Sequence, residues 1–266
     1  MVDSDAANPA VLPGAGTQVW SHGTRRPKAV LMFHGYTHTP AQFAALGERF
    51  YAQGYNVLAP RAPLHGLVQQ DAHAGVTAAG LRGHALAAWA VASSLGTEVG
   101  VVGISAGAVL ASWLATRPTL QVRRLLVIAP FYDPHPRKAA RPVAAALRIL
   151  YRPGLLPDRV TDRGYSYTAL AQYLSIAAAI RRVPEGTRLT RVAAALSEAD
   201  DAVHPETALA VPAAIAAAAG AAFSSYLIPA AAKLGHDILT PAALGDHTEK
   251  VHSRYLELFA GHPVPC

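Results

Sequence analysis

Cysteine is almost absent from this chain, because Cys266, the last residue, is the only one. An internal disulfide framework is therefore impossible, and a zinc site built from several cysteines is excluded. The chain also lacks an apolar run of the about eighteen residues that a membrane-spanning helix needs. Its first residues do not follow the basic and then apolar pattern of a signal peptide. We therefore expect a soluble, cytoplasmic protein without stable membrane insertion.

Hydrophobic residues make up 52% of the 266 residues, which is enough for a substantial core without disulfides or metals. The net charge is +6, and its surplus is concentrated in one segment. The basic residues of that segment are Arg137, Lys138, Arg141, Arg148, Arg152, Arg159, Arg163, Arg181, Arg182, Arg188 and Arg191. Only Asp158, Asp162 and Glu185 oppose them there. Such a segment is either a solvated surface or a region that attracts anionic substrates or interfaces. No nucleic-acid-binding motif accompanies the charge, so we expect no nucleic acid partner.

Short apolar runs alternate with helix-like stretches along most of the chain. The runs lie at residues 29–33, 57–59, 99–102, 125–129, 192–196 and 226–228, and residues 1–18 are a loose arm or a first short strand. The helix-like stretches lie at 40–52, 77–94, 105–117, 205–219 and 248–259. Runs that are apolar on both faces are typical of parallel strands covered by helices. The pattern predicts an α/β fold with a doubly wound, mostly parallel sheet flanked by helices.

Residues 131–188 interrupt this alternation. They are rich in proline and contain two further helix-like stretches, at 143–151 and 167–182. We interpret them as a helical lid inserted into a core domain formed by residues 1–130 and 189–266. The apolar face of the second stretch either shapes a binding site or simply packs on the core.

The pentapeptide Gly-Ile-Ser-Ala-Gly at residues 103–107 is the sharpest signal in the sequence. It directly follows an apolar strand and directly precedes a helix. A serine on such a turn adopts strained backbone angles, and glycines two positions away on either side relieve the crowding. The turn also places Ser105 at a helix N-terminus, where free N–H groups favour a developing anion. The competing interpretation of Ser105 is a helix N-cap between two packing glycines.

Three other stretches occur in an order that completes a known pattern. They are His-Gly-Tyr-Thr at 34–37, Asp-Asp-Ala-Val-His-Pro at 200–205 and Gly-His-Asp at 235–237. Together with residues 59–66 they make the chain resemble the α/β-hydrolase superfamily, specifically its small carboxylesterases and monoacylglycerol-lipase-like members. One departure is Leu64, where the family usually has a glycine; this affects a turn and not the chemistry.

The resemblance implies a serine nucleophile, a histidine base and an acid, in that chain order. We expect Ser105, His236 and Asp200 to fill these roles. Asp201 is the nearest alternative acid, with a local role such as capping the next helix, and Glu198 is a distant third. We expect His34 and His65 to brace loops, and His247 and His252 to lie on the surface.

The resemblance also assigns the oxyanion hole to the backbone N–H groups of Tyr36 and Ala106. The implied activity is hydrolysis of small-molecule carboxylic esters with short- to medium-chain acyl groups, without metal or organic cofactor. The same triad also serves lipases, thioesterases and amide or carbon–carbon hydrolases. A different class, a non-catalytic ligand-binding protein with this fold, is disfavoured because all three positions are filled. The sequence does not determine the oligomeric state.

Overall fold

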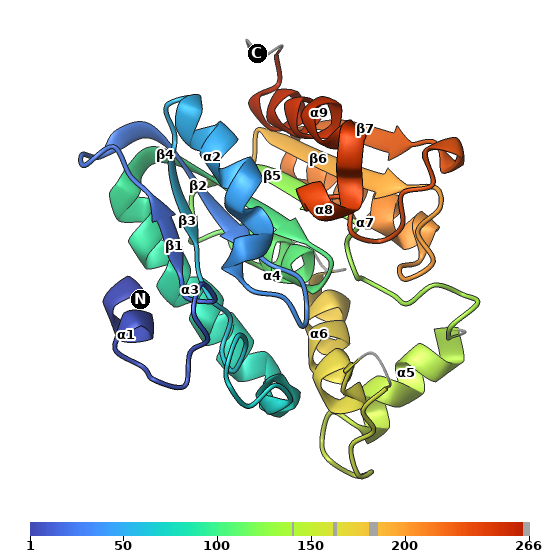
Figure 1. Ribbon diagram of the computed structural model, residues 1–266. Coiled ribbons are helices and arrows are strands. Elements are labelled where there is room, and N and C mark those ends of the chain that lie inside the picture. Colours follow the sequence, from blue (N-terminus) through green and yellow to red (C-terminus); the bar gives the residue numbers. More distant parts are fainter. Residues whose placement is uncertain (140, 162–163, 181–185, 263–266) are drawn as a thin grey trace.

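The computed structural model describes residues 1–139, 141–161, 164–180 and 186–262 of the chain (Figure 1). Expectations for Asp162, Arg163, Arg181, Arg182, Glu185 and Cys266 lie outside the described residues. So does the predicted end of the helix-like stretch at 167–182.

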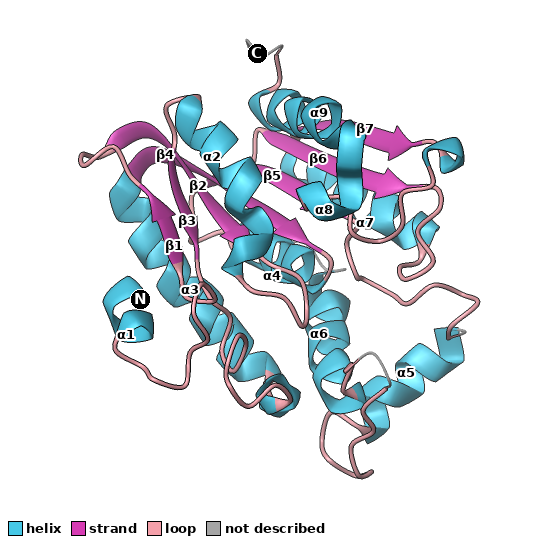
Figure 2. Cartoon of the chain, in the orientation of Figure 1, coloured by secondary structure: helices cyan, strands magenta, loops and turns pink. Residues whose placement is uncertain are grey.

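The strands form one seven-stranded sheet in the order β1-β3-β2-β4-β5-β6-β7 (Figure 2). They are β1 (Gln18–Trp20), β2 (Arg26–Phe33), β3 (Asn56–Ala59), β4 (Gly96–Ile104), β5 (Val122–Ile128), β6 (Arg191–Ser197) and β7 (Ala222–Ile228). All neighbouring strands are parallel except β1, which runs antiparallel to β3. The predicted mostly parallel sheet is therefore confirmed, and the second half of β2 is buried as a central strand requires.

Helices cover both faces of the sheet, as a doubly wound fold requires (Figures 1 and 2). The helices are α1 (Val2–Ala6), α2 (Ala44–Ala52), α3 (Ala78–Leu95), α4 (Ala106–Ala115), α5 (Arg141–Leu150), α6 (Tyr167–Ile180), α7 (Pro205–Ala219), α8 (Pro241–Leu244) and α9 (Thr248–Ala260). Short 3-10 turns are η1 (Pro40–Phe43), η2 (Ala72–Gly75), η3 (Ala230–Ala232) and η4 (Gly245–His247). Residues of α3, α4, α6 and α7 share one core cluster with the sheet. Residues of α2 and α9 share the cluster on the opposite face.

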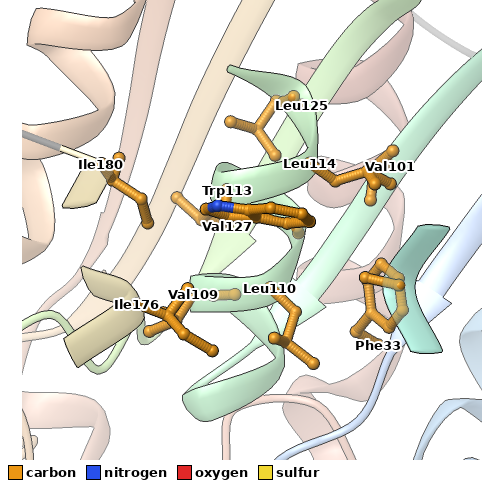
Figure 3. Close-up of a cluster of buried hydrophobic side chains, with 14 of the residues drawn as sticks. Phe33, Val101, Val109, Leu110, Trp113, Leu114, Leu125, Val127, Ile176 and Ile180 are labelled. Atoms are coloured by element: carbon orange, nitrogen blue, oxygen red, sulfur yellow. The ribbon is translucent and has the colours of Figure 1, made fainter. Parts of the chain in front are cut away.

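Helix α4 is buried along its whole length, because it lies between the sheet and α6. Its Trp113 and Leu114 pack among side chains of β4 and β5, and Val109 lies beside Ile176 of α6 (Figure 3). Helix α6 thus belongs to the main core, although it lies within the interrupting segment 131–188. Helix α5 precedes it on the outside of the molecule (Figure 1).

The N-terminal residues correct one expectation. They contain the short helix α1 as well as strand β1. Asp5 of α1 forms an ion pair with Arg61 at 2.7 Å and accepts hydrogen bonds from the Thr17 N–H and hydroxyl. These contacts hold residues 1–17 against the core, so they are not a loose arm.

The expectation of a surface position for His252 is wrong. Its side chain is fully buried, and its Nε2 lies 2.7 Å from the carbonyl oxygen of Leu239. His252 shares its helix face with Tyr255 and Phe259, at spacings of three and seven residues, and this face of α9 packs on the sheet. His247 is exposed, as expected.

Candidate active site

Ser105 lies on the turn between β4 and α4 with φ 54° and ψ −119°. A non-glycine residue in such a conformation carries about 1–3 kcal/mol of backbone strain. The Ser105 N–H donates to the carbonyl of Ile128 at 2.9 Å, and the Ser105 carbonyl accepts from the Phe131 N–H at 3.1 Å. These bonds to the end of β5 fix the turn, and no side-chain hydrogen bond at the N-cap involves Ser105. Its hydroxyl is therefore not used as a helix cap.

The two glycines of the pentapeptide are required by close packing. A Cβ atom on Gly107 would lie 2.1 Å from the carbonyl oxygen of Phe33. A Cβ atom on Gly103 would lie 2.5 Å from the carbonyl oxygen of Gly107. Strand β2, strand β4 and helix α4 can meet behind Ser105 only because both side chains are missing.

Ser105, His236 and Asp200 form a continuous chain of hydrogen bonds. The Ser105 hydroxyl lies 2.8 Å from Nε2 of His236, and Nδ1 of His236 lies 2.8 Å from Oδ2 of Asp200. The Asp200 side chain is 1% exposed, whereas that of His236 is 27% exposed. With Nδ1–H donating to the carboxylate, Nε2 is free to accept the proton of the serine hydroxyl. This arrangement has the geometry required for nucleophilic attack assisted by a general base.

The alternative acids lie elsewhere. Asp201 pairs with Lys138 at 3.0 Å on an exposed part of the surface. Helix α7 begins at Pro205 with no side-chain cap, so the expected capping role is not seen for Asp201. Glu198 accepts from the N–H of Ala230 at 3.0 Å. The second oxygen of Asp200, Oδ1, accepts from the N–H groups of Ala202 and Val203, which holds the carboxylate in place.

His34 and His65 brace loops, as expected. His34 donates from Nδ1 to its neighbour's carbonyl at 2.9 Å and accepts at Nε2 from the Ala62 N–H at 3.0 Å. His65 lies 2.8 Å from the carbonyl of Pro63. Burial lowers the pKa of His65 to about 4, and burial together with His65 lowers the pKa of His34 well below its ordinary value. Both rings are therefore neutral at pH 7.

The segment after β2 contains a buried residue, Gln42, whose role the sequence did not indicate. Gln42 of η1 is buried, and its Oε1 accepts from the N–H of Gly35 at 2.8 Å. The next N–H along the chain is that of Tyr36. Within the described part of the chain, the N–H groups of Tyr36 and Ala106 donate to no protein acceptor. The sequence position of Gln42 indicates no hydrogen-bond partner, so its contact with Gly35 is recognised only in the folded structure.

A cavity of about 400 Å³ opens beside Ser105 and His236. The core contributes Gly35, Tyr36 and Gln42 to its lining. Segment 131–188 contributes mostly apolar side chains, among them Phe131, Leu147, Tyr165, Leu170 and Leu174. The cavity is thus polar near the serine and apolar farther away, which suits a substrate with a reactive polar group and an apolar chain.

Among the described residues, no group of three or more histidine, cysteine, aspartate or glutamate side chains is arranged to hold a metal ion. Likewise, no helix of the described ranges is long and apolar enough to span a membrane.

Several solved structures share this fold. One, from work on LipS and LipT, two metagenome-derived lipolytic enzymes, has a TM-score of 0.71 and 22% identity, covering 95% of this chain and 100% of the other. A soluble variant of monoglyceride lipase from Saccharomyces cerevisiae has a TM-score of 0.66 and 12% identity, with 91% of each chain covered. The monoacylglycerol lipase of Paleococcus ferrophilus has a TM-score of 0.68 and 12% identity, covering 91% and 98%. No curated protein matches the chain in sequence.

The family model described as serine aminopeptidase, S33, matches residues 24–221. This span runs from β2 through Ser105 and Asp200 to the end of α7, and it includes segment 131–188. The chain therefore belongs to the serine aminopeptidase S33 family of α/β hydrolases.

Proposed function

We propose that the protein hydrolyses carboxylic esters through an acyl-enzyme on Ser105. The observation that carries this proposal is the hydrogen-bonded chain of Ser105, His236 and Asp200 on the wall of an apolar cavity. Serine alone is a poor nucleophile at neutral pH, and His236 is the base that takes its proton.

In the proposed mechanism, His236 takes the hydroxyl proton while Ser105 attacks the ester carbonyl. Asp200 stabilises the imidazolium that forms. The alcohol then leaves with the proton from His236, and an acyl group remains on Ser105. A water molecule, activated by the same histidine, attacks the acyl-enzyme and releases the acid. The reaction needs neither a metal nor an organic cofactor.

The backbone N–H groups of Tyr36 and Ala106 are the proposed oxyanion hole. Two observations support this: both flank Ser105 at the cavity, and neither has a protein acceptor among the described residues. One well-placed donor of this kind stabilises the transition state by about 3 kcal/mol. Since both donors belong to the main chain, side-chain substitution does not remove them.

Residues 131–188 are the proposed lid over a core of residues 1–130 and 189–266, with α6 as the part of the lid that packs into this core. The support is their contribution to the cavity, where Leu147 of α5 and Leu170 and Leu174 of α6 form apolar walls. A cavity of about 400 Å³ suits a short- to medium-chain acyl group. The substrate is then a small ester whose acyl chain lies against α5 and α6.

An ester fits this cavity better than an aminopeptidase substrate does. Recognition of a free amino terminus needs a carboxylate that faces the substrate ammonium. Outside the triad, the described lining contains the carboxylates of Asp201 and Asp237. Asp201 pairs with Lys138, and Asp237 accepts from the Leu239 N–H and from both the N–H and hydroxyl of Thr240. Asp237 is therefore satisfied within its own turn, and Asp201 lies in an exposed ion pair with a cation of the protein.

The test is the release of p-nitrophenol from acetate, butyrate, octanoate and palmitate esters by the wild type and Ser105→Ala. A thioester and an aminoacyl anilide extend the panel to the alternative substrates. We expect hydrolysis of the shorter esters, with a maximum at butyrate or octanoate, and its loss in Ser105→Ala. Faster cleavage of palmitate, the thioester or the anilide would replace the esterase assignment with that activity. No turnover of any substrate by folded protein would favour a non-catalytic binding role.

A further inference from the structure

The side chain of Tyr36 makes contacts that the proposed mechanism does not use. Its main-chain N–H is a proposed oxyanion donor, yet its hydroxyl is buried and bonded on two sides. The hydroxyl accepts from the N–H of Ser166 at 3.2 Å and lies 2.9 Å from Nδ1 of His73. His73 belongs to η2 of the core, whereas Ser166 belongs to segment 131–188. One hydroxyl therefore joins three parts of the chain.

The protonation states agree with this geometry. Burial raises the pKa of Tyr36 to about 12, so the hydroxyl keeps its proton and donates it to Nδ1 of His73. Burial lowers the pKa of His73 below its ordinary value, so the ring is neutral. Because the hydroxyl already accepts from the Ser166 N–H, we assign Nδ1 of His73 as the acceptor of the hydroxyl proton. Each partner thus has one role, and the hydroxyl is satisfied as both donor and acceptor.

Ser166 is itself a firm attachment point. Its hydroxyl donates to Oδ2 of Asp158 at 2.6 Å and accepts from the N–H of Ala169 at 3.0 Å, which caps the start of α6. Oδ1 of Asp158 accepts from the N–H of Thr168 at 2.8 Å. The beginning of α6 is therefore joined by several local hydrogen bonds, and the Tyr36 hydroxyl is bonded to it.

The ring of Tyr36 adds apolar contact with the same part of segment 131–188. Its centroid lies 5.9 Å from that of Tyr165 and 5.7 Å from that of Tyr173. Tyr165 lines the cavity, as do Leu170 and Leu174 of the helix that follows. The Tyr36 side chain thus contacts this cavity wall directly, in addition to the packing of α6 on α4 and η2.

We propose that the Tyr36 hydroxyl is a positioning group. It couples the loop after β2, which carries the Tyr36 N–H, to the cavity wall formed by Tyr165, Leu170 and Leu174. The expected effect on kcat rests on the proposed function, whereas the link between the two segments does not. Without the hydroxyl, the Ser166 N–H and His73 Nδ1 lose their partner in a buried place, and both segments relax. The Tyr36 N–H then becomes less well aimed at the oxyanion, while the bulk of the cavity is preserved.

The test compares Tyr36→Phe with Tyr132→Phe. Tyr132 is equally buried, and its hydroxyl lies 2.6 Å from the Ser112 hydroxyl, away from the cavity lining. For Tyr36→Phe we expect kcat to fall about tenfold with little change in KM for the acetate ester, since the donor is misplaced but not deleted. Amide hydrogen exchange in residues 35–37 and 165–170 should accelerate by about fivefold or more in the same variant. Tyr132→Phe should change neither kcat nor amide hydrogen exchange in these residues.

Equal kcat and equal exchange in the two variants would overturn the coupling. If Tyr36→Phe does not fold, His73→Leu removes only the acceptor and should produce the same changes at smaller size. A wild type that hydrolyses no ester would remove the proposed function. The exchange comparison would still decide whether Tyr36 joins the two segments.

Discussion

At the residue scale, the two oxygens of the Asp200 carboxylate have different partners. Oδ1 is held by two backbone N–H groups, and Oδ2 faces His236. An asparagine can keep the first set of bonds, but its amide then donates toward Nδ1 of His236. The imidazole would change to the tautomer that carries its proton on Nε2, which cannot accept from Ser105.

We therefore predict that Asp200→Asn lowers kcat roughly a thousandfold or more while leaving the melting temperature nearly unchanged. Asp201→Asn, which alters an exposed ion pair with Lys138, should keep kcat within about threefold of the wild type. Measurement of kcat for the butyrate ester in both variants shows which of the two aspartates acts as the acid. A larger loss in Asp201→Asn would move the acid role to Asp201.

Sequence motifs led to Ser105, His236 and Asp200 because the chemistry demands fixed residue types in a fixed chain order. The structure brings these three side chains together. The bonds of Gln42 to Gly35 and of Tyr36 to His73 and Ser166 were not predicted. These hydrogen bonds join residues that are separated in the sequence by 7, 37 and 130 positions, so no local sequence pattern indicates them.

At the element scale, the close junction of β2, β4 and α4 requires that Gly103 and Gly107 carry no side chains. The sequence predicted this for the glycines of the pentapeptide. It did not predict the conformation at Leu64, where the structure has φ 62° in a non-glycine residue. A positive φ is a conformation that glycine adopts more readily than leucine. For the apolar face of α6, the sequence allowed packing on the core or a role in a binding site, and in the structure residues of α6 do both.

Gly107→Ala should destabilise the protein by about 2–4 kcal/mol, because a Cβ atom 2.1 Å from the Phe33 carbonyl forces β2 and α4 apart. Gly83→Ala is the matched control. Gly83 lies in α3 at an exposed position with no heavy atom within 4 Å of the added Cβ. This substitution should stabilise the protein by about 0.5–1 kcal/mol. Urea unfolding measures both, and equal effects would contradict the packing argument.

At the scale of the whole molecule, buried neutral histidines link stability to pH. The unfolded chain binds protons at His65 below its ordinary pKa of 6.5, whereas the folded protein does so only near its lowered pKa of about 4. Unfolding therefore takes up protons between these values, and stability falls as the pH decreases. His34 acts in the same direction.

From pH 7 to pH 5, we predict that His65 alone lowers the free energy of unfolding by about 2 kcal/mol. Replacement of His65 by glutamine should remove this part of the pH dependence, whatever its effect on stability at pH 7. Urea unfolding of both proteins at the two pH values measures the difference. An unchanged pH dependence in His65→Gln would exclude this role.

The basic surplus of segment 131–188 acts over longer distances. Arg152 and Arg159 are exposed there, and Asp158 is engaged with Ser166 and Thr168. We predict that raising the salt concentration from 50 to 500 mM lowers kcat/KM severalfold for a hemisuccinate ester, with little effect on the neutral butyrate ester. The double variant Arg152→Gln, Arg159→Gln should reduce this difference. Equal salt responses of the two esters would mean that the charge is only a solvated surface.

The proposed reaction requires Ser105 to be a nucleophile activated by His236. Mass spectrometry after reaction with a fluorophosphonate probe identifies the residue that is labelled. We predict a single adduct on the peptide that contains Ser105, formed by the wild type and absent in Ser105→Ala and, on the same timescale, in His236→Ala. No adduct in folded wild-type protein, or an adduct on another residue, would contradict it.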